Sequence, residues 1–387
     1  MRFIDIIVYI ILAMLPAGLP AQIKPGADQP DLYYPLLKDK QVGVVANQAS
    51  VVGGGSIVDV LVQHEIQVIR IFSPEHGFRL SAEAGQIIGN AVDSLTGIEV
   101  VSLYGARKKP TPGDMEHLDL ILFDIQDVGV RFYTYISTLT YVMEACAEAG
   151  VPLVVLDRPN PNGFYIDGPV LEKKFSSFVG LHPVPVVYGM TIGEYAMMVN
   201  GEGWLKNGVK CNLRVIPVKN YSHQDRCGLP AKPSPNLPNA DAILLYPSLC
   251  FFEGTPVSVG RGTPFPFQVY GHPELKYCKF IFTPVGIPGK SAHPPLEGER
   301  CFGEDLREYY MKNPGESGKV KLTWLLESYK AWKDKNTFFT DYFNKLAGNN
   351  ILQQQITQGK SEKVIRQTWQ PGVEKFKKIR KKYLLYK

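Results

Sequence analysis

Short runs of continuously apolar residues are the feature that most restricts how this chain of 387 residues can fold. Between them lie segments in which apolar residues recur at helical spacing, as at Ile136, Leu139, Met143 and Cys146 before Gly150. A strand with no polar face must be buried on both sides, so the alternation predicts a mostly parallel sheet with helices on both faces. We expect its strands at residues 41–47, 68–72, 99–103, 119–124, 153–157, 213–218 and 242–246.

The fold class that follows is α/β, with a Rossmann-like sheet over residues 22–265. Thr191 and Glu194 have the spacing of a capping box, which predicts a helix that begins there. Beyond this region, prolines separate short apolar pieces, and the chain then becomes helical and charged. We expect residues 266–387 to form a smaller α+β domain that ends in a basic helix with one apolar stripe.

Residues 1–21 have the pattern of a secretory signal peptide. Arg2 gives a positive start, residues 6–15 are an apolar core, and residues 16–21 contain small residues and prolines. An uncleaved membrane anchor is the weaker alternative, because the apolar run is short for a bilayer and is broken at Pro16. We therefore expect an exported protein, periplasmic or secreted, with no stable membrane span after cleavage.

Several motifs that would indicate other functions are missing from the sequence. There is no G-x-G-x-x-G fingerprint of a nicotinamide enzyme, no G-x-S-x-G elbow of a serine hydrolase and no nucleotide-binding P-loop. The six cysteines show no C-x-x-C spacing, so a zinc site of the usual kind is not expected. No basic patch with interleaved aromatic residues indicates a nucleic-acid partner. No motif in the sequence thus indicates a metal or a cofactor.

Polar residues follow the ends of several predicted strands. In the stretch from Ile71 to Arg79, Ser73 and Pro74 stop a strand, and Glu75 and His76 come next. Because the carboxyl ends of parallel strands lie on one edge of a sheet, we expect the polar residues after them to form one site. These residues are Glu75, His76, Tyr104, Asp124, Asp127, Arg131, Tyr133, Asp157, Arg158, Asn160, Asn162, Glu253, Arg261 and Thr263.

The residue types at this edge fit cleavage of a glycosidic bond. Carboxylates act there as general acid and as base or nucleophile, while tyrosines and amides hold hydroxyl groups. The candidate catalytic residues are Glu75, His76, Glu253 and Asp124. A neutral sugar does not require arginines, but a carboxylate on the substrate would pair with them. The candidate substrate-binding residues are Asp127, Arg131, Tyr133, Arg158, Asn160, Arg261 and Thr263.

Structural roles remain open for several of these residues. Asp124 stands where turn-forming residues also occur, and Arg131 could pair with Asp127. His76 could orient Glu75 instead of reacting itself. The second catalytic group is left open among Asp124, Asp127, Glu253 and a tyrosine.

Several long motifs in order resemble those of the NamZ-type exo-β-N-acetylmuramidases. They are Ser-Pro-Glu-His-Gly-Phe-Arg at 73–79, Phe-Asp-Ile-Gln-Asp-Val-Gly-Val-Arg-Phe-Tyr-Thr-Tyr at 123–135, Leu-Asp-Arg-Pro-Asn-Pro-Asn-Gly at 156–163, Gly-Met-Thr-Ile-Gly-Glu at 189–194 and Glu-Gly-Thr-Pro-Val-Ser-Val-Gly-Arg-Gly-Thr at 253–263.

The resemblance implies a glycoside hydrolase that removes N-acetylmuramic acid from the non-reducing end of peptidoglycan fragments. Its substrates would be muropeptides or MurNAc-GlcNAc saccharides, and the family's catalytic glutamate falls on Glu75. N-acetylmuramic acid carries a lactyl carboxylate, which one or two of Arg131, Arg158 and Arg261 would bind. The alternative is a non-catalytic envelope protein that binds muropeptides in the same cleft.

Overall fold

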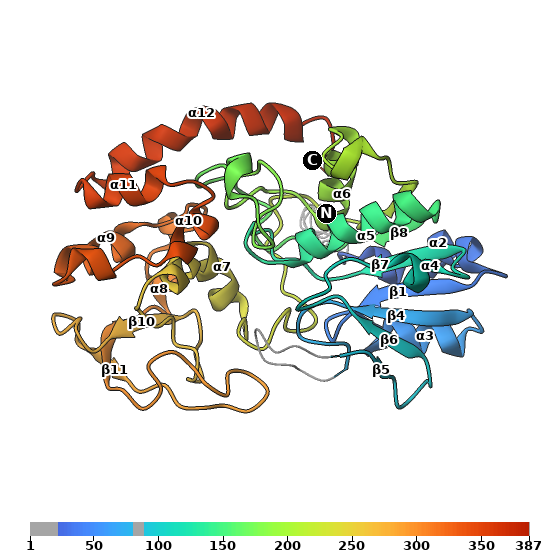
Figure 1. The fold of residues 1–387 in the computed structure, drawn as a ribbon, viewed down its shortest axis with the longest axis horizontal. Coiled ribbons are helices and arrows are strands. Elements are labelled where there is room, and N and C mark those ends of the chain that lie inside the picture. Colours follow the sequence, from blue (N-terminus) through green and yellow to red (C-terminus); the bar gives the residue numbers. More distant parts are fainter. Residues whose placement is uncertain (1–21, 80–88, 387) are drawn as a thin grey trace, which may run out of the picture.

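The computed structural model describes residues 22–79 and 89–386, so the signal peptide expected at 1–21 lies outside the described residues. In this part of the chain a seven-stranded sheet has the order β5-β6-β4-β1-β7-β8-β9 (Figure 1). All neighbouring strands are parallel except the edge strand β5. The strands are β1 (Val42–Ala46), β4 (Val68–Ser73), β5 (Ala91–Val92), β6 (Glu99–Ser102), β7 (Leu120–Asp124), β8 (Leu153–Leu156) and β9 (Leu213–Ile216).

The strand order makes β1 the point from which the sheet grows in both directions. The chain runs outward from β1 through β4 and β6, and then returns to the other side of β1 to add β7, β8 and β9. In such doubly wound sheets the crevice outside the carboxyl ends at this reversal is where ligands bind. The predicted Rossmann-like α/β fold is therefore confirmed, and its topology indicates where a site is expected.

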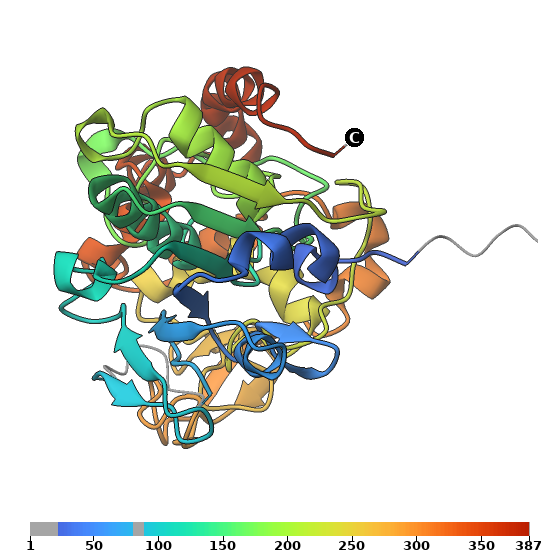
Figure 2. The same cartoon turned by 90° about the vertical axis from the view of Figure 1, so that its right-hand side faces the viewer.

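Helices cover both faces of the sheet (Figure 2). One face packs against α2 and α3, and the other packs against α5 and α6. Consecutive side chains of β1 point to opposite faces, so Val44 lies in the core under α2 and α3 and Val45 in the core under α5 and α6. The helices are α2 (Pro30–Leu37), α3 (Ile57–Gln63), α4 (Pro112–Met115), α5 (Tyr135–Ala149) and α6 (Ile192–Gly201), and a short hairpin joins β2 (Val51–Val52) to β3 (Gly55–Ser56).

The later part of the chain forms a smaller α+β region beside the sheet (Figure 1). Its antiparallel sheet has the order β10-β12-β11, and the apolar stripe of its last helix is buried through Ile365, Trp369, Val373 and Phe376. None of the helices in the described ranges could span a membrane. The elements are α7 (Ala240–Leu249), the 3-10 helix η4 (Cys250–Gly254), β10 (Val269–His272), β11 (Phe280–Phe282), β12 (Cys301–Asp305), α8 (Tyr309–Lys312), α9 (Thr323–Ala331), α10 (Asp341–Ala347), α11 (Ile351–Thr357) and α12 (Glu362–Arg380).

The strand predicted at 242–246 is wrong, because these residues lie in the helix α7. The side-chain oxygen of Asn239 accepts a hydrogen bond from the backbone N–H of Ala242 at 3.0 Å and caps the helix, with Asp241 in its first turn. A short apolar run is compatible with either a buried strand or a buried helix. The capping residue Asn239 was the sequence signal that favoured a helix. Glu253 therefore lies on η4, which follows the helix α7 and not a strand.

Candidate active site

A cleft of about 470 Å³ lies at the carboxyl ends of β4, β6 and β7. Its other wall comes from residues beyond 230, so both parts of the chain line it. A neighbouring cavity of about 320 Å³ has no acidic residue among its lining residues, and it offers no comparable chemistry. The polar residues that line the cleft include Glu75, His76, Tyr104, Tyr133, Thr134, Ser234, Asn236, Glu253, Ser258, Arg261, Ser291, His293 and Tyr342.

A tight turn after β4 presents Glu75 to the cleft. His76 has a φ of 75° and Gly77 a φ of 79°, both in the left-handed region. The backbone N–H of Gly77 donates to the carbonyl of Pro74 at 3.2 Å and closes the turn. A residue with a side chain pays a conformational cost in this region, so the turn at His76 must be held by its surroundings.

Hydroxyl groups hold the carboxylate of Glu75. Thr134 Oγ1 donates to Glu75 Oε2 at 2.9 Å, from the residue that precedes α5. The Tyr104 hydroxyl also bonds Glu75, and burial together with the nearby carboxylate raises the pKa of Tyr104 above its ordinary value. Tyr104 therefore stays protonated as a donor, and the N-terminus of α5 adds a favourable field for negative charge.

The second carboxylate in the cleft is Glu253, on η4. Arg261 Nε and Nη2 both donate to Glu253 Oε1, at 2.8 and 2.7 Å, while Cys250 Sγ lies 3.4 Å from Oε2. Arg261 thus neutralises one oxygen, and among the described residues the other oxygen has only a weak thiol donor. In the described ranges, Glu75 and Glu253 are the carboxylates that line the cleft.

Asp124 and Arg158 pair with each other outside the cleft lining. Arg158 Nε and Nη2 donate to Asp124 Oδ1 and Oδ2 at 2.6 and 2.8 Å, and both side chains are buried. This bidentate pair joins the carboxyl ends of β7 and β8. Removal of one partner from such a buried pair costs ~3–5 kcal/mol. Neither residue lines the cleft. The structure therefore does not support Asp124 as a catalytic group or Arg158 as a substrate ligand.

Arg131 is also buried, and its partners are backbone carbonyl groups instead of Asp127. Nη1 donates to the carbonyls of Pro169 and Val184, at 2.7 and 2.8 Å. Nη2 donates to Leu346 and Ala347 at the C-terminus of α10, at 2.8 and 2.9 Å. Burial lowers the pKa of Arg131 to about 9, and these bonds occupy both terminal nitrogens of the guanidinium.

Comparison with known proteins identifies the family. Profiles of the exo-β-N-acetylmuramidase NamZ match its N-terminal part over residues 42–241 and its C-terminal part over residues 244–386. The chain belongs to the NamZ family. It is therefore a glycosidase, that is, a hydrolase, as the motifs predicted.

Individual relatives cover nearly the whole chain. The peptidoglycan β-N-acetylmuramidase NamZ of Bacillus subtilis (strain 168) is 39% identical over 374 residues, which cover 92% of this chain and 89% of that protein. A solved DUF1343 family protein of Bacteroides fragilis NCTC 9343 has a TM-score of 0.88 at 45% identity, covering 95% of this chain and 99% of that chain. A second one from the same organism has a TM-score of 0.77 at 28% identity, covering 94% and 99%.

The remaining predicted site residues of this NamZ-family chain shape the backbone around the cleft. Asp127 accepts from Gly129 N–H at 2.7 Å and from the Tyr188 hydroxyl, and burial raises the pKa of Asp127 to about 6. Asn160 Nδ2 donates to the carbonyl of Met190 at 2.8 Å, and Thr263 Oγ1 donates to Gly260 at 2.6 Å.

Gly129 explains why the Asp127 and Asn160 loops can approach each other. Its φ is 74°, and a Cβ there would lie 2.2 Å from the Asn160 side chain, so another residue would force the loops apart. Of the predicted substrate-binding residues, Tyr133 and Arg261 line the cleft. Tyr133 is fixed there because its hydroxyl donates to the carbonyl of Pro233 at 2.7 Å.

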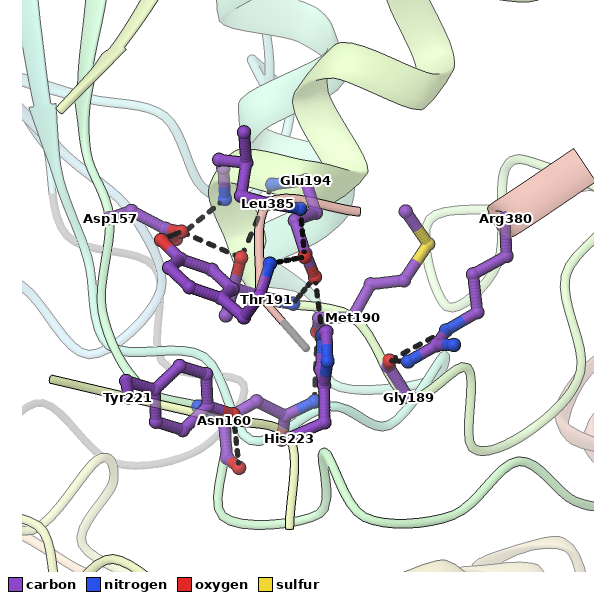
Figure 3. Close-up of polar contacts among 12 residues, drawn as sticks. Asp157, Asn160, Gly189, Met190, Thr191, Glu194, Tyr221, His223, Arg380 and Leu385 are labelled. Carbon is purple, nitrogen blue, oxygen red and sulfur yellow. Dashed lines mark hydrogen bonds and ion pairs between the residues drawn. The ribbon is translucent and has the colours of Figure 1, made fainter. Parts of the chain in front are cut away.

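Asp157, which directly follows β8, and Glu194 of α6 bind the end of the chain (Figure 3). Asp157 accepts from Thr191 Oγ1 at 2.7 Å and from the Tyr386 hydroxyl. Glu194 accepts from the backbone N–H of Leu385 at 2.7 Å and contacts His223 Nε2 at 2.8 Å. The capping box predicted at Thr191 and Glu194 is confirmed, and the same carboxylate also holds the C-terminal segment.

Some residues of the cleft escaped the sequence analysis. Thr134 lies inside a recognised motif and directly before a helix, so its position beside the site could have been found. Tyr342 belongs to α10, far along the chain, and no local pattern connects it with Glu75. Ser234, Asn236 and His293 lie on irregular segments without a strand end to mark them.

The contact between Tyr386 and Asp157 gives a stability prediction. Tyr386→Phe should lower the free energy of unfolding by ~1–3 kcal/mol, because Asp157 and the N–H of Val218 both lose a buried hydrogen-bond partner. Tyr383→Phe is the control, since that hydroxyl bonds Glu202 in a more exposed setting. Denaturant unfolding measures both variants, and equal effects would contradict the buried role of Tyr386.

Asp157 also predicts a pH dependence of stability. Burial raises the pKa of Asp157 to about 7 from its ordinary 3.8, so the folded state keeps a proton that the unfolded state releases. This contribution is fully present below about pH 4 and is lost as the pH rises through about 7. The Asp157→Asn variant cannot ionise at this position. Between about pH 4 and pH 7, the unfolding free energy of the wild type should therefore fall relative to that of the variant by up to ~1.4 kcal/mol per pH unit. Parallel pH profiles for the two proteins would contradict the assignment.

Proposed function

We propose that this chain is an exo-acting glycoside hydrolase that releases N-acetylmuramic acid from the non-reducing end of peptidoglycan fragments, with MurNAc-GlcNAc saccharides or muropeptides as substrates. The observation that carries the proposal is the pairing in one cleft of Glu75 and Glu253, each fixed by its own donors. The name of the Bacillus subtilis relative, a peptidoglycan β-N-acetylmuramidase, supports the substrate class.

The two carboxylates divide the work of glycoside hydrolysis. One group must protonate the leaving oxygen, and a carboxylate must activate water or attack the anomeric carbon. Glu75 is the central acid and base, because Thr134 and Tyr104 orient its carboxylate in the cleft. Glu253 is the second carboxylate, since Arg261 stabilises its negative charge in the partly buried cleft.

Arg261 is the arginine that we assign to the lactyl carboxylate. Arg131 and Arg158 are buried against carbonyl groups and Asp124, and neither of them lines the cleft. Arg261 lines the cleft, and its Nη1 has no hydrogen-bond partner among the residues that the structure describes. A guanidinium that already holds Glu253 by one edge would offer its remaining N–H groups to a substrate carboxylate.

Export of the chain is part of the proposal. The signal pattern in residues 1–21 supports a periplasmic or secreted enzyme. Such a location would place the enzyme in the same compartment as peptidoglycan fragments.

Glu75→Gln tests the catalytic role. The amide keeps the size of the side chain but cannot exchange a proton, so kcat on a chromogenic β-N-acetylmuraminide should fall by ~10²–10⁴. Binding of N-acetylmuramic acid, measured by calorimetry, should persist. Glu148→Gln at the surface, where Glu148 pairs with Lys109, is the matched control and should leave both quantities unchanged. A wild type that binds the sugar but never hydrolyses the substrate would instead be a non-catalytic binding protein.

Arg261→Lys tests the recognition of the lactyl group. Lysine keeps the positive charge beside Glu253 but loses the planar fork, so the inhibition constant of N-acetylmuramic acid should rise by about tenfold or more. The inhibition constant of N-acetylglucosamine, which lacks the lactyl group, should change little. An equal rise in both inhibition constants would mean that Arg261 only holds Glu253 and does not bind the lactyl group. Arg158→Lys, the comparison variant, should lower stability without altering the ratio of the two constants.

A further inference from the structure

Helix α10 brings an aromatic residue from late in the sequence into the cleft. Tyr342 lies on its first turn and lines the same cleft as Glu75 and Glu253. The residue is 37% exposed, although its side chain is large and mostly apolar. The neighbouring Phe343 is fully buried and anchors the helix. Tyr342 is therefore not needed to hold α10 in place.

The N-terminal end of α10 is fixed against the segment that carries Glu253. The backbone N–H of Thr340 donates to the carbonyl of Gly254 at 2.9 Å. A Cβ on Gly254 would lie 2.5 Å from Cα of Phe343, so only glycine permits the helix to come this close. Tyr342, one residue before Phe343, is thereby held beside Glu253.

The C-terminal end of α10 is fixed by Arg131, which donates to the carbonyls of Leu346 and Ala347. A cation at this end also complements the helix dipole. With both ends held, the position of Tyr342 relative to the sheet is set by buried contacts and does not depend on its own exposed side chain.

Ionisable groups from both walls of the cleft act electrostatically on the phenol of Tyr342. Burial raises its pKa first, and Cys250, Glu253, Glu75 and Tyr104 raise it further. The phenol is therefore a neutral hydrogen-bond donor within electrostatic reach of both reacting carboxylates. A phenol can donate one hydrogen bond and also accept one, which suits contact with a sugar hydroxyl or ring oxygen.

We propose that Tyr342 is a catalytic residue of the C-terminal region, whose hydroxyl donates a hydrogen bond to the reacting sugar between Glu75 and Glu253. This inference rests on the proposed function, because it takes those carboxylates as the reacting groups. The ring forms the lip of the cleft beside the sugar, and the rigid helix holds the donor ready before substrate arrives. The active site is then complete only with α10 in place.

Tyr342→Phe is the decisive variant, because it keeps the ring and removes the hydroxyl. On a chromogenic β-N-acetylmuraminide, kcat/KM should fall by about tenfold to a hundredfold, mostly through kcat, with an unchanged unfolding temperature. Tyr342→Ala should weaken sugar binding in addition. Tyr277→Phe, at an exposed tyrosine outside the cleft, is the matched control and should match the wild type.

The outcomes separate this inference from the proposed function. If the wild type hydrolyses the substrate and Tyr342→Phe stays within about twofold of it, the inference is overturned and the function stands. If the wild type does not hydrolyse the substrate, the proposed function fails. Calorimetry with N-acetylmuramic acid then tests whether the Tyr342 hydroxyl contacts the sugar. Weaker binding by Tyr342→Phe would then still place the hydroxyl on the sugar, and unchanged binding would remove it.

Discussion

The guanidinium of Arg131 is the contact on which the arrangement of the cleft depends. It comes from the loop after β7, and it reaches the last carbonyls of α10, more than two hundred residues later in the chain. A buried cation without a carboxylate partner is costly, and here four charge-assisted bonds to carbonyl groups offset that cost. The carbonyls at the end of a helix carry partial negative charge, so the position favours a cation. This interior charge thus links α10, on the second wall of the cleft, to the loop after β7.

This dependence explains why the sequence predicted the sheet better than the site. Buried strands and the turn at Glu75 leave local signals, because apolar runs and prolines act within a few residues. Asp124, Arg131 and Arg158 carry the chemistry expected of a site, but the direction of a side chain from a strand end is set by partners distant in the sequence. Arginine was predicted as a substrate ligand at three positions, and the structure uses two of them as interior links.

The cleft itself could be predicted only in part. Glu75 stands on the wall that topology marks, at the carboxyl edge near the reversal at β1, and a strand-end rule finds it. Glu253 was found for a wrong reason, since the apolar run before it is helix α7 and not a strand. Tyr342 was not found, because α10 meets η4 through the packing of Gly254 on Phe343, a contact without a local sequence signal.

Because the carboxylates belong to different walls, their separation is a tertiary property. Retaining glycosidases place the two groups ~5–5.5 Å apart and inverting ones ~6.5–9.5 Å, so a shift of a few ångströms would change the stereochemical course. The walls are joined far from the cleft as well, where Asp167 accepts from Arg366 at 2.7 Å and from Trp369 at 3.1 Å. Glu194 binds the chain end in the same way. Buried polar contacts outside the cleft lining therefore set how the wall that carries Glu75 lies relative to the wall that carries Glu253.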